Sequence, residues 1–339
     1  MTRRVSSVRM VGREDALAVL EAAMERAAHG SPRLVLVAGD AGLGKTRLAR
    51  ELAARAASAS SEVLWGDCVP VQAGELPYAP IVAALRGLRS PGPVHGELAR
   101  LLPELGRAPE PTAAPHAQAR LFELLLGLLG RLGAEAPVLL VIEDLHWADG
   151  ATQDLLRFLA RNLRDERLLL LVTLRADDVV APTLLELVGE LTRSPCAERL
   201  DLEPLTHEAT ALQVEGIVGG RAEAELVAWV HARAQGNPYF AEELLAARTA
   251  GEAAPELPAS LRSLLLLRVA GVSETARRVL GVAAAAGREI DHDTLEAAAG
   301  VDEASLAAAL HELLNAHVLV RADDRYASVS YTHLTLPTN

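Results

Sequence analysis

The sequence contains one lysine, Lys45, among 33 Lys and Arg residues. It lies in the segment Gly39-Asp40-Ala41-Gly42-Leu43-Gly44-Lys45-Thr46, which fits the phosphate-loop pattern G-x-x-x-x-G-K-[ST]. An ammonium is a compact charge on a slim side chain, whereas a planar guanidinium would crowd a loop wrapped around phosphates. The retained lysine therefore predicts that this loop binds a nucleoside triphosphate.

The segments on either side of this loop match what the pattern requires. Residues 33–38 have the continuous apolar pattern of a buried parallel strand, and residues 46–53 have the pattern of a helix. A glycine-rich turn that binds nothing is the competing interpretation, and the strand and helix argue against it. We expect Gly39, Gly42 and Gly44 to turn the backbone with positive φ, so that successive N–H groups face the phosphates at the positive end of the helix dipole.

Within this segment we expect a division of roles among the side chains. Lys45 is predicted to reach the β- and γ-phosphates, and the Thr46 hydroxyl is predicted to bind Mg²⁺. Arg47 follows directly and is included among the residues that bind the cofactor. The cofactor is predicted to be ATP with Mg²⁺.

A phosphate loop needs acidic groups on the far side of the metal, and Glu143 and Asp144 follow the apolar run 138–142. In the usual pair the first carboxylate supports the metal and the second polarises the attacking water. We therefore assign Glu143 to the metal and Asp144 to catalysis. The reverse assignment, with Asp144 on the metal, stays open.

The remaining pattern predicts an α/β fold with a parallel sheet covered by helices on both faces. Half of the residues are hydrophobic but only 3% are aromatic, so the cores must consist mainly of Leu, Val and Ala. Helices are expected at residues 15–28 and 118–132, and loops with short helices at 87–115. The five expected strands cover residues 33–38, 63–66, 138–142, 168–173 and 199–202.

Helices dominate after Thr206. The pattern predicts helices at 206–218, 222–234 and 239–248, a linker at 251–258, and then short helices before a hairpin around residues 322–324. Helices followed by a small hairpin are typical of a winged-helix module. The predicted domains are an N-terminal segment with a helix (1–30), a P-loop ATPase domain (31–204), a helical lid (205–255) and a winged-helix-like domain (256–328).

The last residues, 329–339, differ abruptly in composition, and residues 329–334 resemble the translation of a transposon-end adapter from sequencing libraries. We expect that this tail is not native and that the natural protein continues beyond residue 328.

Composition excludes several classes of protein. The net charge of −12 argues against a nucleic-acid surface, which needs clustered Lys and Arg. The segment 256–328 alone has seven Arg and eleven Asp or Glu. Cys68 and Cys196 are isolated, as expected of structural thiols in a reducing compartment. The most apolar stretch, 121–132, is too short to span a bilayer, and no signal peptide opens the chain. A cytoplasmic protein without a membrane partner is expected.

Three further motifs carry a family resemblance. Val141-Ile142-Glu143-Asp144-Leu145-His146-Trp147-Ala148-Asp149 resembles the Walker B region of the signal-transduction ATPases with numerous domains, the STAND class, which includes the large LuxR-type transcriptional regulators. Val11-Gly12-Arg13-Glu14 resembles the N-terminal box that lies against adenine in that family. Gly236-Asn237-Pro238-Tyr239-Phe240, followed by Glu242-Glu243-Leu244, resembles its lid motif. With the phosphate loop, four boxes appear in the family's order over roughly residues 11–328.

The resemblance implies further roles. It places a γ-phosphate-sensing arginine at Arg175, and a guanidinium can bind phosphate oxygens in a bidentate manner. It also implies that Val11, Gly12 and Arg13 contact the nucleotide and that Pro238 packs against it from the lid. His146 and Trp147 are interpreted as packing residues. The sequence departs from the commonest form of the family by placing Glu before Asp in the acidic pair, which leaves the rate of turnover open.

The expected function is a slowly hydrolysing ATP-dependent molecular switch, a module of a signal-transduction or transcriptional regulator that binds ATP and ADP. Self-association on activation is one expectation, and the fragment itself is expected to bind no specific DNA, which would be read by a missing C-terminal domain. Two alternatives stay open. One is an oligomeric AAA-type motor or loader with an arginine supplied in trans, and the other is a nucleotide-binding scaffold in which Glu143 prevents hydrolysis.

Overall fold

The computed structural model describes residues 7, 9–69, 77–88, 98, 117–175, 182–249, 269, 272–286, 290–315, 318–322 and 325–328. The chain divides into two compact units, Met10–Glu203 and a unit that joins Met1–Arg9 to everything from Pro204 onward. The predicted linker 251–258, most of residues 87–115 and the tail 329–339 lie outside the described residues.

The unit Met10–Glu203 contains, within its described residues, a five-stranded parallel sheet in the order β2-β3-β4-β1-β5. β4 lies between β1 and β3, so the strand that leads into the glycine-rich loop and the strand that ends in the acidic pair both pair with β4. The prediction of a parallel sheet with helices is confirmed, and each strand was located to within two residues at either end. The strands are β1 (Arg33–Gly39), β2 (Glu62–Asp67), β3 (Val138–Glu143), β4 (Leu168–Arg175) and β5 (Ala197–Asp201).

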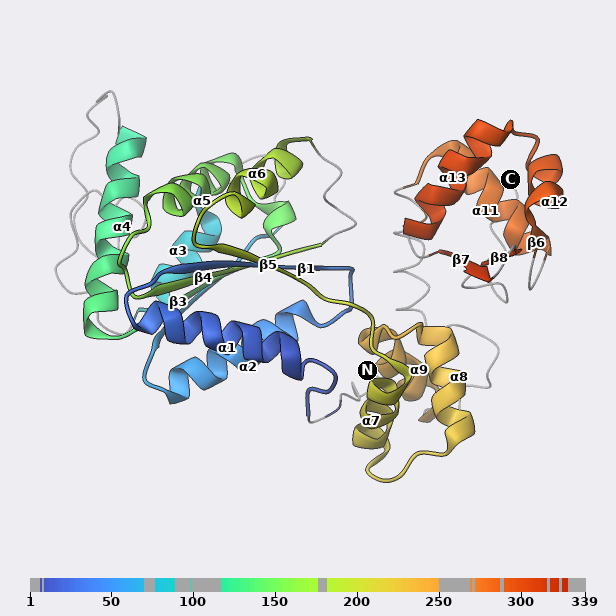
Figure 1. The fold of residues 1–339 in the computed structure, drawn as a ribbon, viewed down its shortest axis with the longest axis horizontal. Helices are drawn as coiled ribbons and strands as arrows, with labels where there is room; N and C mark the ends of the chain where they lie inside the picture. The colour runs from blue at the N-terminus through green and yellow to red at the C-terminus, as the bar shows by residue number, and fades with distance from the viewer. Residues whose placement is uncertain are drawn as a thin grey trace. The chain divides into compact units, whose positions relative to one another are not determined.

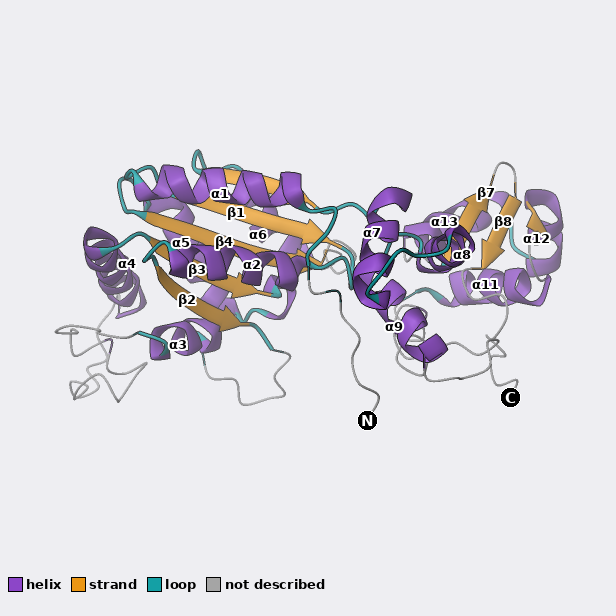
Figure 2. Ribbon diagram, turned by 90° about the horizontal axis from the view of Figure 1, so that it is seen from below, coloured by secondary structure: helices purple, strands orange, loops and turns teal. Residues whose placement is uncertain are grey.

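Helices cover both faces of this sheet (Figure 1, Figure 2). Side chains alternate along β1, so that Val35 and Val37 pack with α1 (Glu14–Ala28) and α2 (Lys45–Ser58). Leu34 and Leu36 lie in the opposite core, against α3 (Ala79–Arg86), α4 (Ala117–Glu135), α5 (Gly150–Asn162) and α6 (Pro182–Thr192). Two apolar environments explain why the strands are apolar at every position.

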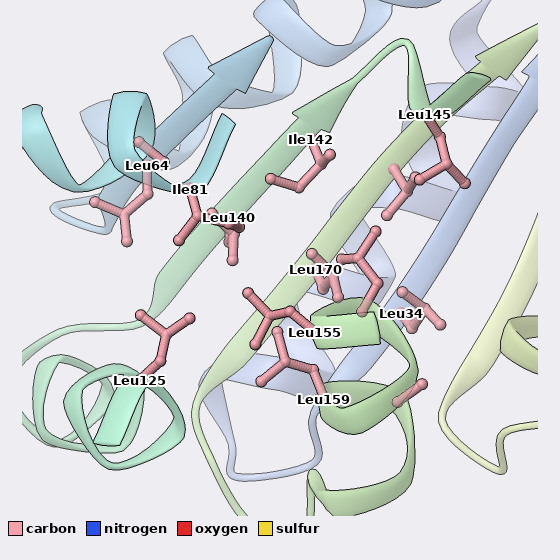
Figure 3. Close-up of a cluster of buried hydrophobic side chains, with 14 of the residues drawn as sticks. Leu34, Leu64, Ile81, Leu125, Leu140, Ile142, Leu145, Leu155, Leu159 and Leu170 are labelled. Atoms are coloured by element: carbon pink, nitrogen blue, oxygen red, sulfur yellow. The ribbon is translucent and has the colours of Figure 1, made fainter. Parts of the chain in front are cut away.

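Leucine fills most of the larger core (Figure 3). Leu34, Leu140 and Leu170 come from three neighbouring strands and contact side chains of α4 and α5, such as Leu125 and Leu155. Burying each leucine contributes about 1.5–3 kcal/mol relative to exposure, so this core needs few aromatic side chains beside Tyr78 and Phe122. The helices α3, α5 and α6 were not predicted from the sequence.

The second unit begins with three helices, α7 (His207–Val218), α8 (Ala224–Ala234) and α9 (Pro238–Thr249). They share a core that includes Val214, Val230 and Phe240. Thr206 caps α7, because its hydroxyl accepts a hydrogen bond from the N–H of Ala209. These helices occupy the region predicted to be a lid, and that functional assignment stays a prediction.

The motif Gly236-Asn237-Pro238 forms the start of α9. The Asn237 side chain accepts hydrogen bonds from the N–H groups of Tyr239 (3.1 Å) and Phe240 (3.3 Å), and Pro238 occupies the first helical position. Gly236, at φ 73°, accepts a hydrogen bond of 2.7 Å from the N–H of Leu205. The motif therefore fixes the path by which the chain enters the helices.

The described C-terminal residues contain α11 (Glu274–Ala286), β6 (Ile290–Asp291), α12 (His292–Ala299), α13 (Glu303–Asn315), β7 (Leu319–Ala322) and β8 (Arg325–Ser328). Their three strands form an antiparallel sheet in the order β6-β8-β7. Leu280, Leu295, Leu313 and Tyr326 lie in the common core. The assignment of this region as a winged-helix-like domain stays a prediction.

Across the described part of the chain, no helix has both the length and the apolar character needed to cross a bilayer.

The start of α9 gives a stability prediction with an internal control. A Cβ at Gly236 would collide with the main-chain oxygen of Leu205 and lie 2.9 Å from the Cβ of Pro204, whereas Gly219, at φ 76°, has open space. We expect Gly219→Ala to cost about 1 kcal/mol for its positive φ alone. Gly236→Ala should cost about 3 kcal/mol or more, because overpacking adds to that strain.

Hydrogen exchange of the full chain, read by mass spectrometry over α7, α8 and α9, measures both effects as changes in local opening. Equal exchange in the two variants would contradict the close approach of Leu205 and Pro204 to Gly236.

Candidate functional site

The loop Gly39–Thr46 connects the end of β1 to the start of α2. Gly42 and Gly44 have φ of 86° and 94°, the left-handed region predicted for them. Gly39 also has a positive φ, 155°, and a Cβ there would lie 3.1 Å from the main-chain oxygen of Leu202, which is a tight approach. Gly44 is the N-cap of α2, so the loop leads directly into the positive end of the helix dipole. This conformation suits the binding of an anion by main-chain N–H groups.

The other side chains of the loop are not equivalent. Leu43 is buried in the core with α1 and α2, and this packing anchors the loop to that core. Asp40, Ala41 and Thr46 are half-buried, as is Arg47 in the first turn of α2. Leu43 is therefore a packing residue.

Lys45 lies across its own loop. The ammonium group donates hydrogen bonds to the main-chain oxygens of Gly39 (2.7 Å) and Asp40 (2.9 Å), and the residue is only 7% exposed. These partners are neutral carbonyls, whereas a phosphate oxygen carries a negative charge that adds direct attraction for the ammonium. The ammonium is thus held at the loop by groups that an anionic ligand can replace favourably.

Glu143, the last residue of β3, is 3% exposed and forms side-chain hydrogen bonds with Thr46 and Thr173. Burial raises the pKa of its carboxyl, and the charges of Asp144 and Asp67 act in the same direction, while the two hydroxyl groups oppose the shift. One carboxylate oxygen, Oε1, is buried without a hydrogen-bond partner. The structure therefore joins the two residues predicted to hold the metal, Thr46 and Glu143, and leaves one acidic oxygen unsatisfied.

Asp144 differs from its neighbour. Its backbone is left-handed, with φ 55° and ψ 52°, and its side chain is 36% exposed. The N–H of Asp144 donates to the hydroxyl of Thr173 at 2.9 Å, and a carboxylate oxygen lies 3.9 Å from Nδ1 of His146. One acid of the pair is buried against the loop, and the other reaches solvent. This difference agrees with separate roles for the two acids. The assignment of Glu143 to the metal and Asp144 to catalysis stays a prediction.

Two arginines lie near the loop, Arg13 from before it in the chain and Arg175 from after it. Arg175 ends β4, in register with Gly39 on β1, and it is half-buried. The Arg13 guanidinium donates to the main-chain oxygen of Leu43 at 3.0 Å, and burial lowers its pKa against the opposing charge of Glu14. Val11 and Gly12, which precede it, are half-buried. The predicted N-terminal box thus supports the phosphate loop directly.

Three acidic or polar residues near the site were not predicted to have a role. Asp67 ends β2 in register with Glu143, and the Cys68 N–H that follows donates to the main-chain oxygen of Glu143 at 2.9 Å. Asp149 caps α5. The third residue is Thr173. The sequence could have indicated it, because it is the one polar side chain within the apolar run of residues 168–174. Asp67 carries a similar signal, an acidic residue directly after a strand.

The residues present fit a magnesium nucleotide. Among the described residues, no group of three or more His, Cys, Asp or Glu could hold a metal by itself. Mg²⁺ usually binds proteins through one or two oxygen ligands together with substrate phosphates and waters. The unsatisfied Oε1 of Glu143, beside the Thr46 hydroxyl and the phosphate loop, supplies such a partial set of ligands.

Pro238 belongs to the other compact unit, which begins at Pro204. Its main-chain oxygen accepts a hydrogen bond of 2.8 Å from the Gln213 side chain. The contact between Pro238 and the nucleotide therefore stays a prediction from the resemblance.

The fold and the loop define a P-loop ATPase module. Residues 9–172 match the family described as an AAA ATPase domain, which supports an AAA-type module in this part of the chain. The chain is also 27% identical over 325 residues to an uncharacterized protein of Rhizobium meliloti (strain 1021). That alignment covers 85% of this chain and 30% of the relative, so the chain spans less than a third of the relative's length.

Two solved structures resemble the whole chain. The ORC2 protein of Aeropyrum pernix, solved as ADPNP and ADP complexes, has a TM-score of 0.60 at 15% identity, covering 98% of this chain and 94% of that one. The Walker-type ATPase of Pyrococcus abyssi has a TM-score of 0.57 at 15% identity, with 97% and 96% covered. At this identity the similarity establishes the fold. The class predicted from the sequence is supported at the level of an AAA-type ATPase module, and the STAND and LuxR assignments are not.

The two cysteines allow a test of the burial at the end of β2. Burial, and then the charges of Asp149 and three further carboxylates, raises the pKa of the Cys68 thiol to about 12. Because the thiolate is the reactive form, at pH 8 only about one Cys68 in ten thousand is ionised. We expect iodoacetamide to modify half-buried Cys196 at least about 100-fold faster than Cys68, as peptide mass spectrometry can measure.

Labelling in denaturant, where both thiols should react at similar rates, is the control. Similar rates in the folded protein would contradict the burial of Cys68.

Proposed function

We propose that this chain is an ATP-binding, slowly hydrolysing switch module of a cytoplasmic signal-transduction or transcriptional regulator. The observation that supports it most is Glu143, a buried carboxylate bonded to the hydroxyl of Thr46, with one oxygen unsatisfied. A buried acidic oxygen without a partner costs free energy unless a cation or donor compensates it. Its place beside the phosphate loop makes a magnesium nucleotide the most suitable partner.

In this proposal each residue of the site has one task. The loop N–H groups and Lys45 bind the phosphates, and Thr46 and Glu143 hold Mg²⁺, which neutralises phosphate charge when bound. Asp144 orients and polarises the attacking water, and Arg175 distinguishes ATP from ADP by contact with the γ-phosphate.

The connections between the two units favour a switch. The chain passes between them after Arg9 and again after Glu203. Near the first passage, Arg13 bonds to the phosphate loop, and Ser7, 3% exposed, packs against α7 at Gly216. Near the second, Leu202 lies against Gly39. A change in the loop on nucleotide exchange therefore has two short covalent routes to the helices.

The regulatory context rests on the motifs and on length. The chain spans about 30% of its relative in Rhizobium meliloti, which suits one module of a larger protein. We propose that sensor and DNA-binding parts belong to the remainder and that this chain alone binds no specific DNA, in keeping with its net charge of −12.

An oligomeric AAA-type motor is the alternative class, and ATP turnover measured against protein concentration separates the two. A ring that completes its site with a neighbour's residue speeds up per molecule as it assembles, whereas a switch module with a complete site does not.

Lys45→Met tests the proposal directly. The substitution keeps an unbranched side chain one heavy atom shorter and removes the charge, so ATP affinity should fall about 100-fold or more while the unfolding temperature is retained. Calorimetry with Mg²⁺ and ATP measures the affinity. Because Lys45 is the only lysine, ATP should also protect a single side-chain amine from acylation. An affinity equal to that of the wild type, with no protection, would refute a phosphate-loop role.

The acidic pair is tested by two isosteric variants compared side by side. Asp144→Asn should retain Mg²⁺-dependent ATP binding and lower the hydrolysis rate about 100-fold, the size expected for loss of a general base. Glu143→Gln should reduce the effect of Mg²⁺ on ATP affinity, because it removes a charged ligand. The reversed pattern would assign the metal to Asp144, and no change in either variant would support a scaffold without hydrolysis.

A further inference from the structure

A cavity of about 410 Å³ is formed by the C-terminal parts of α5 and α6 and by the residues that follow each helix. The two helices lie side by side on one face of the sheet (Figure 1). The lining of the cavity contains four arginines against one glutamate, in a chain whose net charge is −12. The arginines are Arg157, Arg161, Arg164 and Arg193. Positive charge is thus concentrated here although the chain as a whole is acidic.

The cavity lies at the opposite edge of the sheet from the phosphate loop. Arg164 precedes the start of β4 and Pro195 precedes the start of β5, whereas the phosphate loop follows the end of β1. These three strands are parallel, so their starts lie at one edge and their ends at the other. The eight residues of β4 span about 26 Å. The arginines therefore cannot reach a nucleotide bound at the phosphate loop of the same chain.

The ends of the two helices do not explain the arginines. An arginine near a helix C-terminus often bonds to the last carbonyls of the helix. Here short side chains bond to such carbonyls instead: the Ser194 hydroxyl donates to Ala160 at 2.6 Å, and the Thr192 hydroxyl donates to Val188 at 2.8 Å. Within the described contacts, Arg164 is the one arginine of the four whose guanidinium bonds to a main-chain oxygen.

The glutamate neutralises only part of this charge. Oε2 of Glu190 lies 3.2 Å from a guanidinium nitrogen of Arg157 and 3.2 Å from one of Arg161. Among the residues that the structure describes, no carboxylate pairs with the guanidinium of Arg164 or Arg193. The cavity therefore has cationic donors available for an anion from outside the chain.

The lining favours one kind of anion. A guanidinium presents a planar fork of N–H donors that fits phosphate oxygens in a bidentate manner. Two such forks suit a phosphate group, which has more oxygens and more charge than a single carboxylate. Ala160, Leu191 and Pro195 add apolar surface, and the volume is within the range of small-molecule sites.

We propose that this cavity is a second anion site, which binds a small phosphate-bearing molecule separately from the nucleotide of the phosphate loop. The site binds this molecule without transforming it, because the Ser194 hydroxyl already donates to a carbonyl and Glu190 is paired with two arginines. The inference goes beyond the proposed function and does not depend on ATP binding.

The test uses inorganic phosphate and phenyl phosphate as probes, at slightly alkaline pH, where both are dianions. Binding is followed by phosphorus NMR in the Lys45→Met chain as well as the wild type, because the phosphate loop is itself a predicted anion site. In Lys45→Met we expect one saturable site per chain, weakened by added salt, and no new phosphorus signal. Tighter binding of phenyl phosphate would identify an organic phosphate as the ligand, and equal binding would identify free phosphate.

Variants made in the Lys45→Met chain assign the site to the cavity. The double variant Arg164→Gln with Arg193→Gln should bind at least about tenfold more weakly. The matched control, Arg55→Gln with Arg199→Gln, removes the same charge from the same unit at arginines paired with acids, and it should retain the affinity. Glu190→Gln should raise the affinity about threefold or more, because it releases two guanidinium groups and removes a repelling charge.

Four results would overturn the proposal. They are no binding by Lys45→Met, equal affinities in the double variant and its control, displacement of phenyl phosphate by a short DNA duplex, and binding that appears only as the chain self-associates. Sedimentation at the NMR concentrations detects self-association, which would indicate that the arginines face a neighbouring chain. Absence of ATP binding by the wild type would overturn the proposed function and leave this site unaffected.

Discussion

The site depends on keeping the Glu143 carboxylate buried at the end of β3. Desolvating an ionised carboxylate costs several kcal/mol, and only strong local interactions offset that cost. Two hydroxyl groups, from Thr46 on the phosphate-loop helix and Thr173 on β4, supply part of the compensation. The unsatisfied oxygen shows that the compensation is incomplete in the protein alone. A cation or a hydrogen-bond donor at Oε1 would compensate that oxygen.

The strand order makes this arrangement possible. β4 pairs with both β1 and β3, so one strand contributes Arg175 beside Gly39 and Thr173 beside the acidic pair. The two residues are two positions apart, and in a strand such residues lie on the same face. β4 thus connects the phosphate loop to the acids through rigid backbone pairing, which a loop at the same place would not provide.

Much of the fold and part of the site could be predicted from the sequence, for a physical reason. Strands buried on both faces are continuous apolar runs, and the phosphate loop needs glycine where φ is positive, as at Gly42 and Gly44. These signals are local. Thr173 was missed because its partner Asp144 follows β3, about thirty positions away, and a single threonine in an apolar strand also suits plain packing. The bond from Arg13 to Leu43 crosses a similar separation, and the motif suggested only a nucleotide contact for it.

The lid motif shows how a structural requirement and a functional one can share the same residues. Gly236 is needed for the approach of Leu205, and Asn237 caps α9 through two main-chain N–H groups. Both requirements exist without a nucleotide, so the motif by itself is weaker support for binding than the phosphate loop is. Pro204 and Leu205, which the motif contacts, come two and three residues after Leu202, which packs on Gly39 of the loop. The conformation of Gly236 and Asn237 is therefore explained by the packing of this unit, whether or not Pro238 contacts the nucleotide.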